Sequence, residues 1–290
     1  MKTLLLSVLL VSLLWIGGCG TTRSVGEQVD RVQLDPETFL ETHHRNWSNL
    51  PRLDTRASGS TWWEDQQGRH VDRFQIRLFY EAPHDLAVNC SVLGSRVAWI
   101  GASSAESWIF MFDKDETVLM ISDDQDTSDD RSVPIWSAQV LKQVLMLSPL
   151  PPLSSGSIDW DSKGRLMLTL PVAGNRPWSS IRLCVDESGH VRRQELLAAD
   201  STELASAEYD DHVSVPVDSM APGDYPRLPR RIRITTSRDS GMNIFLDEPT
   251  GRGGPRKRRL FDLEQLKQQF KPDRIERVNG PAGTSELGGE

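Results

Sequence analysis

The chain has 290 residues, of which 38% are hydrophobic and 26% are charged, and its formal net charge at pH 7 is −8. A folded chain of this length buries roughly 70–75% of the surface that it exposes when unfolded, so it can form a sizeable core. The negative charge argues against a nucleic-acid partner, because binding to phosphate relies on clustered lysine and arginine. It also argues against general adhesion to anionic lipid.

The N-terminus has the features of a secretory signal over residues 1–18. Lys2 gives a positive start, an apolar run extends from Leu4 to Ile16, and two glycines precede Cys19. The run is too short to span a membrane comfortably. Its ending resembles the lipobox of bacterial lipoproteins, which implies cleavage before Cys19 and lipidation of the thiol. A plain signal peptide cleaved elsewhere and an uncleaved anchor remain the alternatives.

Lipidation of Cys19 predicts attachment to a membrane. Acyl chains contribute about 0.8 kcal/mol per buried methylene, so several chains together anchor a protein firmly. In bacteria that sort lipoproteins, an Asp after the cysteine signals inner-membrane retention. Gly20 stands there instead, which favours the outer membrane and a body facing the periplasm. Residues 19–34 are polar and lack periodicity, so we expect a tether.

The first half of the body predicts a helix followed by strands. Asp35 and Pro36 begin a helix that continues to Leu50 with one apolar stripe. A strand is expected over residues 57–64. Residues 71–112 predict four antiparallel strands, because apolar and polar side chains alternate with a period of two. A further strand is expected over residues 116–122, and residues 123–131 form an acidic loop.

The second half predicts a helix, more strands and a short final helix. Pro134 opens the helix, which ends near Leu147. Strands are expected over residues 164–171, 179–186, 190–197, 203–211, 230–236 and 242–247. Asp262 caps the last helix, and residues 273–290 are expected to be a disordered tail. Strand–helix–strand units do not recur, so the prediction is an α+β protein with a curled antiparallel sheet, an unclosed β-barrel whose concave face is covered by helices.

The order of these elements resembles the LolA/LolB type of bacterial lipoprotein carrier and receptor. The resemblance covers residues 35–248, and we take residues 35–272 as one half-barrel domain. Family members use the concave hollow to hold acyl chains of lipoproteins or related amphiphiles. The chain departs from the family in its length, acidic loop and C-terminal helix, which leaves the cargo open. The matching features are the opening helix, Phe74–Tyr80, Pro83, Leu86, Gly94, Val97-Ala98-Trp99, the helix over residues 135–147, and Ala207-Tyr209.

A pocket is also expected on physical grounds. An open sheet with an aromatic inner face must be covered, and helices with a single apolar stripe can cover it. Lids that pack imperfectly leave an apolar pocket, which is the usual kind of site for an apolar ligand. The alternative is that each of these residues is an ordinary core residue. The predicted lining is Phe74, Ile76, Leu78, Leu86, Val88, Trp99, Trp108 and Phe110 from strands, with Trp47, Trp136 and Leu141 from the lids.

The sequence predicts no enzyme, cofactor or metal site. It lacks the nucleophile elbow, the zinc-binding His-Glu-x-x-His helix and the phosphate loop. His43 and His44 point about 100° apart on a helix, so they do not share an ion. The acidic loop lacks the Gly and Glu that an EF-hand needs. Cys90 and Cys184 are expected to stay free thiols, because the alternation points them to opposite sides of the sheet.

Two functions are consistent with these features. The first is a lipid-anchored envelope protein that binds an apolar ligand, either lipoprotein acyl chains or lipid, as a carrier or receptor. The second is a non-enzymatic scaffold or envelope-stress sensor, which has the same fold but uses it to bind a protein segment. One basic cluster touches lipid headgroups or an acidic partner in one interpretation, and is a solvated turn in the other; it consists of Arg252, Arg256, Lys257, Arg258 and Arg259. The sequence identifies neither the cargo nor a protein partner.

Overall fold

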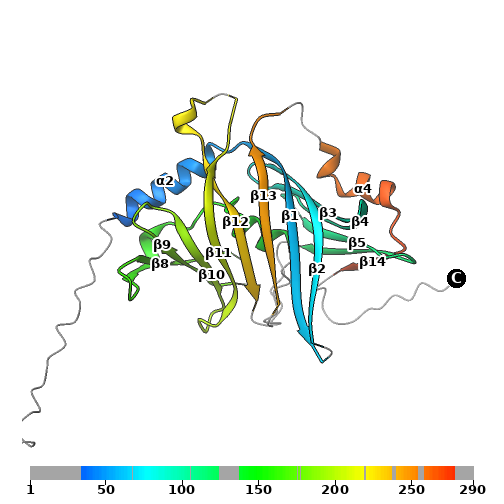
Figure 1. Ribbon diagram of the computed structural model, residues 1–290, viewed down its shortest axis with the longest axis horizontal. Coiled ribbons are helices and arrows are strands. Elements are labelled where there is room, and N and C mark those ends of the chain that lie inside the picture. The colour runs from blue at the N-terminus through cyan, green and yellow to red at the C-terminus, as the bar shows by residue number, and fades with distance from the viewer. Residues whose placement is uncertain are drawn as a thin grey trace, which may run out of the picture.

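A computed structural model describes residues 34–66, 68–104, 106–123, 137–174, 176, 178–218, 220–236, 240–253 and 258–277. The signal segment, Cys19, the tether, Trp136 and nearly all of the acidic loop lie outside these residues. Within them, one sheet contains fourteen strands, and three α-helices pack against it. Figure 1 shows the sheet as a curved surface with α2 and α4 at opposite ends.

The first half of the body follows the predicted order. Asp35 caps the first helix, because its carboxylate accepts the Thr38 backbone N–H at 2.8 Å, and Pro36 occupies the first turn. The first strand begins at Arg52, earlier than the sequence indicates, and pairs along its whole length. The elements are α2 (Pro36–Ser48), β1 (Arg52–Asp65), β2 (Gly68–Glu81), β3 (Asp85–Val92), β4 (Ser95–Ala102), β5 (Glu106–Phe112) and β6 (Thr117–Asp123).

The second half contains one helix that is shorter than predicted and two strands that were not expected. The Ser137 side chain accepts the Val140 backbone N–H and caps α3 (Ala138–Val144). Short 3₁₀ segments lie at Leu153–Ser155, Pro222–Asp224 and Arg258–Leu260. The other elements are β7 (Ser157–Trp160), β8 (Leu166–Pro171), β9 (Ser180–Val185), β10 (Val191–Leu197), β11 (Glu203–Ser214), β12 (Arg227–Thr236), β13 (Gly241–Thr250), α4 (Leu263–Phe270) and β14 (Arg274–Arg277).

The strand order is that of two meanders joined in the middle. It runs β14-β6-β5-β4-β3-β2-β1-β13-β12-β11-β10-β9-β8-β7, so the ends of the sheet do not meet. The chain lays strands outward from β1 to β6, crosses to the far edge at β7, and returns to β13 beside β1. All neighbours are antiparallel except β14 and β6, which are parallel. The predicted α+β class with a curled, unclosed sheet is confirmed.

The strand register assigns each side chain to one face of the sheet. Leu78 pairs with Val88, Val88 with Ile100, and Ile100 with Ile109, so these residues share the concave face. Their neighbours in sequence lie on the convex face by the same alternation. Since the side-chain period is two, this register decides which aromatic residues face the inside.

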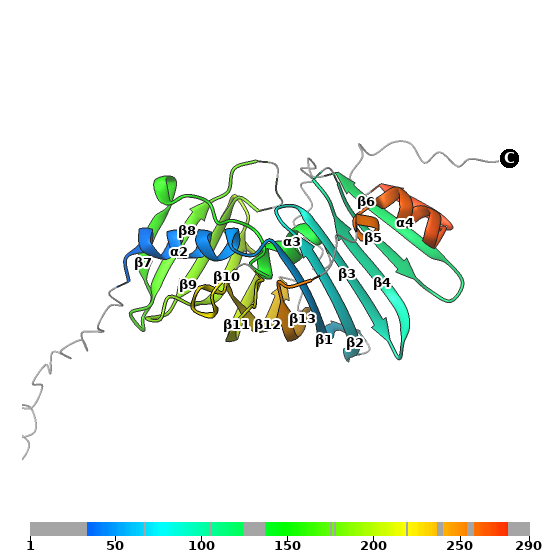
Figure 2. The ribbon, with the colours of Figure 1, turned by 90° about the horizontal axis from the view of Figure 1, so that it is seen from above.

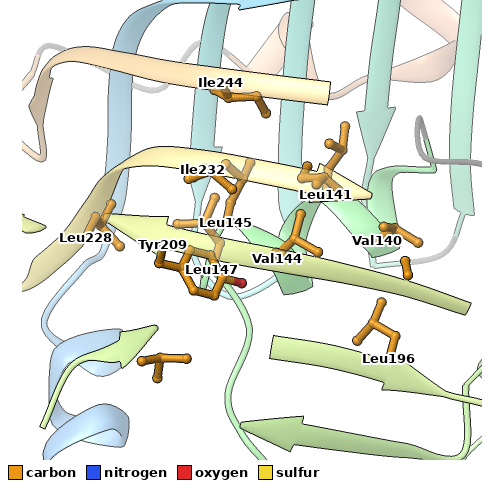
Figure 3. Close-up of a cluster of buried hydrophobic side chains, with 14 of the residues drawn as sticks. Val140, Leu141, Val144, Leu145, Leu147, Leu196, Tyr209, Leu228, Ile232 and Ile244 are labelled. Carbon is orange, nitrogen blue, oxygen red and sulfur yellow. The ribbon is translucent and has the colours of Figure 1, made fainter. Parts of the chain in front are cut away.

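The concave face carries the main core, beneath α2 and α3. Val140, Leu141 and Val144 of α3 are 0–2% exposed and join the cluster formed by the inner faces of the strands. Figure 3 shows them beside Leu196 and Tyr209. Figure 2 shows α2 lying over the β8–β10 part of the sheet. The hollow expected from the sequence is therefore filled over much of its length.

The last helix packs on the convex face rather than the concave one. Leu263 and Leu266 of α4 are buried against a second cluster that includes Trp108, Leu119 and Ile121. Gly101 faces this cluster, and an added Cβ would lie 2.4 Å from the Trp108 ring, so glycine is needed for the indole to approach. The sheet thus has two apolar layers at its β4–β6 end.

Residues 274–277 form an edge strand, although the sequence indicated a tail. β14 pairs with β6, and the Asp273 carboxylate accepts the Thr117 backbone N–H at 2.7 Å. The segment is only four residues long and lacks alternation, so it carries no strand signal of its own. Elsewhere, Cys90 faces the concave side and Cys184 the convex side, and both are free and buried. The prediction of two free thiols is confirmed.

Candidate functional site

An apolar groove lies on the concave face of β1–β6, next to the main core, which shares Phe74, Cys90 and Ile100 with it. Its volume is about 720 Å³, within the range of small-molecule sites. Residues of β1–β6 and the start of β13 line it, and most are apolar. They include Trp63, Phe74, Cys90, Val92, Val97, Ala98, Ile100, Ile109, Met111 and Met120.

The groove differs from the rest of the core because several of its apolar side chains are open to solvent. Trp63 and Val92 are each 37% exposed, and Met111 is 51% exposed. Leu93, in the turn that follows Val92, is fully exposed. Single exposed apolar residues are ordinary, but several along one hollow form a patch that favours binding of an apolar partner.

A strand irregularity turns Val97 toward the groove. The β3–β4 register shifts so that Ala98 opposes Cys90 while Arg96 opposes Ser91, which leaves Val97 as an extra residue on β4. The shift sends the Arg96 guanidinium to the other face, where it lies 4.7 Å from the Phe270 ring centroid. The Arg96 guanidinium therefore stacks on aromatic rings under α4, and the aliphatic side chain of Val97 lines the groove instead.

The groove has little charge along its apolar wall. Trp63 stacks on His70, with ring centroids 5.2 Å apart and an interplanar angle of 13°, which holds the indole at the edge of the groove. Burial raises the pKa of the Cys90 thiol to about 12, so the sulfur stays neutral. Asp72 and Arg73 supply the charged groups of the lining, on β2. Such a surface binds through apolar contact and not through ion pairing.

The predicted lining residues are divided among different places. Phe74 lines the groove. A second group is buried in the main core: Ile76, Leu78, Leu86, Val88 and Leu141. A third group lies on the convex face with α4: Trp99, Trp108 and Phe110. Trp47, on α2, donates its indole N–H to the Leu147 carbonyl at 3.2 Å. Trp136 lies outside the described residues. The predicted residues therefore do not line one hollow.

Sequence reasoning missed most of the groove. Ile109 and Met111 alternate with Trp108 and Phe110 on β5, so both faces of this strand are apolar. The prediction placed the larger aromatic residues, Trp108 and Phe110, on the inner face, whereas they lie on the convex face. The pairing of Val88 with Ile100, which continues through Ile109 to Met120, carries the signal that identifies the inner face.

Metal-ligating clusters and membrane-spanning helices are absent from the described part of the chain. None of its His, Cys, Asp and Glu residues form a group of three that could hold a metal ion. Residues 124–131 of the acidic loop are outside the described residues, so the expectation that this loop is not an EF-hand calcium site is not tested. In the same ranges no helix is long and apolar enough to cross a membrane.

Comparison with known proteins gives matches among solved structures. No family model and no curated protein matches the chain. A LolA superfamily protein from Nitrosomonas europaea aligns with a TM-score of 0.53 and 11% identity, over 80% of this chain and 99% of that one. A DUF1329 family protein from Desulfovibrio piger gives 0.54 and 10%, over 80% and 100%. A putative outer membrane lipoprotein-sorting protein domain from Vibrio parahaemolyticus gives 0.51 and 7%, over 80% and 99%.

These matches define the class of protein at the level of the fold. The chain is an α+β protein built on one strongly curved, unclosed sheet with helices against it. Its fold is LolA-like, as the sequence resemblance implied. Since the identities are 7–11%, the likeness extends to the fold alone.

Proposed function

We propose that the protein is a lipid-anchored envelope protein that binds the acyl part of a lipoprotein or a lipid in the concave groove, as a carrier or receptor. The observation that carries this proposal is the groove itself, where Trp63, Val92 and Met111 are partly exposed along a hollow of about 720 Å³. A ligand that covers these side chains removes apolar surface from water on both partners.

The size of the groove suits an extended hydrocarbon chain. Burying one methylene contributes about 0.8 kcal/mol, so each added carbon multiplies the affinity by about four until the groove is filled. The gross gain is offset by about 4–15 kcal/mol of lost translational and rotational freedom. A moderate net affinity suits a carrier, which must also release its cargo.

The anchor and the location follow from the N-terminus. Lipidation of Cys19 holds the body at a membrane through the tether of residues 19–34, and Gly20 favours the outer membrane. One of the matched structures is that of an outer membrane lipoprotein-sorting protein domain, which supports an envelope location. A carrier fixed to a membrane by lipid acts as an acceptor or donor at that surface.

The test is binding of a chain-length series of neutral acyl ligands to the Cys19→Ser chain without its signal segment. We expect saturable binding whose affinity rises with chain length and then levels off. Binding that is absent, or that is independent of chain length, contradicts the proposal. Co-purification of a protein segment in place of lipid favours the scaffold or sensor function instead.

A further inference from the structure

A second pocket of about 320 Å³ lies between α2 and the segments opposite it, apart from the groove. Residues of α2, β10–β12 and the turns before β10 and β12 line it, and none of them lines the groove. Phe39, Leu50 and Leu228 give it an apolar floor. Its walls are polar, so this pocket has a different chemistry from that of the groove.

The polar walls are rich in N–H donors. Three of the chain's six histidines are here: His43 on α2, His190 before β10 and His212 on β11. Arg45 and Arg227 add guanidinium groups, and Asn46, Asn49 and Tyr225 add neutral polar groups. Among the described lining residues, Asp224 is the one carboxylate, and its side chain is exposed.

Two imidazole nitrogens in this pocket are buried without a hydrogen-bond partner among the described residues. They are Nδ1 of His43 and Nε2 of His212. Buried polar atoms in native proteins almost always have a hydrogen-bond partner, so these two nitrogens are available to a polar group that enters the pocket. The His212 ring stacks on the His190 ring with centroids 4.5 Å apart and an interplanar angle of 20°, which fixes its orientation.

The electrostatics of the pocket match a negative ligand. Burial lowers the pKa of His43 and of His212 to about 4. Burial also lowers the pKa of His190, and Arg227 and Arg192 lower it further, while Asp186 opposes them. The imidazoles are therefore neutral in a region already made positive by arginine, and an anion bound there would stabilise their protonated forms.

We propose that this pocket binds a phosphate-sized oxyanion through the Arg227 guanidinium and the imidazole N–H groups of His43 and His212. Arg227 is already positioned beside His212, because its Nη2 donates to the His212 carbonyl at 3.3 Å. A guanidinium presents several N–H groups in a plane, which suits phosphate better than a point charge does. The oxyanion belongs either to a phospholipid headgroup or to free phosphate, and the inference is independent of acyl binding in the groove.

The experiment follows the histidine side chains of the purified whole chain by NMR in neutral detergent, with ¹⁵N-labelled imidazoles. Inorganic phosphate is added at constant ionic strength against chloride. We expect saturable changes at His43, His190 and His212 and a rise in their pKa values, while His70 and His84, outside the pocket, do not respond. In a second arm, dihexanoyl phosphatidylglycerol replaces phosphate. Response to the lipid as well indicates a headgroup site, and response to phosphate alone indicates a free anion.

Matched variants separate a built site from general attraction to positive charge. Arg227→Gln should weaken phosphate binding at least tenfold, and His212→Gln should weaken it several-fold. Arg231→Gln removes another exposed arginine from the same strand, outside the pocket, and should leave binding unchanged. The proposal is overturned if neither ligand gives a saturable response at the three histidines, or if Arg231→Gln weakens binding as much as Arg227→Gln.

Discussion

Replacing Met111 with glutamate tests the groove without disturbing the core. The Met111 side chain lies on the concave face of β5 and is 51% exposed, so the substitution should change the free energy of unfolding by only about 0.5 kcal/mol. An acyl chain lying in the groove would cover the new carboxylate. Removing a charged group from water without a partner costs at least about 2 kcal/mol, which is about thirtyfold in Kd.

The assay is fluorescence titration of the Met111→Glu protein with a neutral labelled diacylglycerol, so that repulsion between charges does not enter. Val71→Glu is the matched control, because Val71 is 54% exposed and lies on the convex face of β2, in the same half of the sheet. We expect weakened binding for Met111→Glu and wild-type binding for Val71→Glu, with both proteins folded by circular dichroism. Equal affinities for all three proteins would refute the reasoning, and so would equal losses in the two variants.

Three further substitutions probe other parts of the structure. Phe270→Ala removes a ring 5.0 Å from Phe110 and should lower the free energy of unfolding by about 2–3 kcal/mol in urea while leaving acyl affinity unchanged; a loss of affinity would link α4 to the groove. Gly101→Val drives a side chain into Trp108, so we expect a loss of at least about 1–3 kcal/mol; wild-type stability would contradict the packing. Burial lowers the pKa of His43 from 6.5 to about 4, so the unfolded chain binds a proton that the folded chain excludes between these values. The free energy of unfolding should therefore fall by about 2 kcal/mol from pH 7 to pH 5 because of this residue. His43→Gln should remove that part of the pH dependence. A variant whose free energy of unfolding depends on pH as steeply as that of the wild type would contradict the prediction.

Local signals in the sequence were sufficient for most elements and for the class of fold. The helix cap at Asp35 and the period-two alternation of β2 each act within a few residues, so their consequences can be derived without knowing the rest of the chain. Two antiparallel runs of strands separated by a helix then favour one curved sheet whose concave face is apolar. The free thiols followed from the same alternation.

The faces of β4 and β5 could not be derived in the same way. Both faces of β5 are apolar, because Trp108 and Phe110 pack under α4 while Ile109 and Met111 line the groove. Alternation identifies two faces but does not say which one is inside when a helix covers each. The position of α4 depends on contacts between residues about 150 positions apart, and those contacts have no local signature.

The bulge at Val97 and the strand β14 were missed for related reasons. An extra residue in one strand can be recognised only when the register with the neighbouring strand is known. The β3–β4 shift is therefore a property of the two strands together. β14 exists because β6 offers an unpaired edge, so its four residues needed no strong propensity of their own. Both features are set by tertiary structure, as is the pocket that brings α2 to His190 and His212.

Photochemical cross-linking with a diazirine-bearing fatty acid tests the central claim most directly, since it reports where in the folded chain a hydrocarbon lies. After irradiation and digestion, we expect adducts on peptides of β1, β3 and β5, centred on Trp63, Val92 and Met111, and their loss on competition with unlabelled lipid. Adducts on Phe270 and the other residues under α4, or labelling that unlabelled lipid does not reduce, would contradict an acyl-binding groove on the concave face.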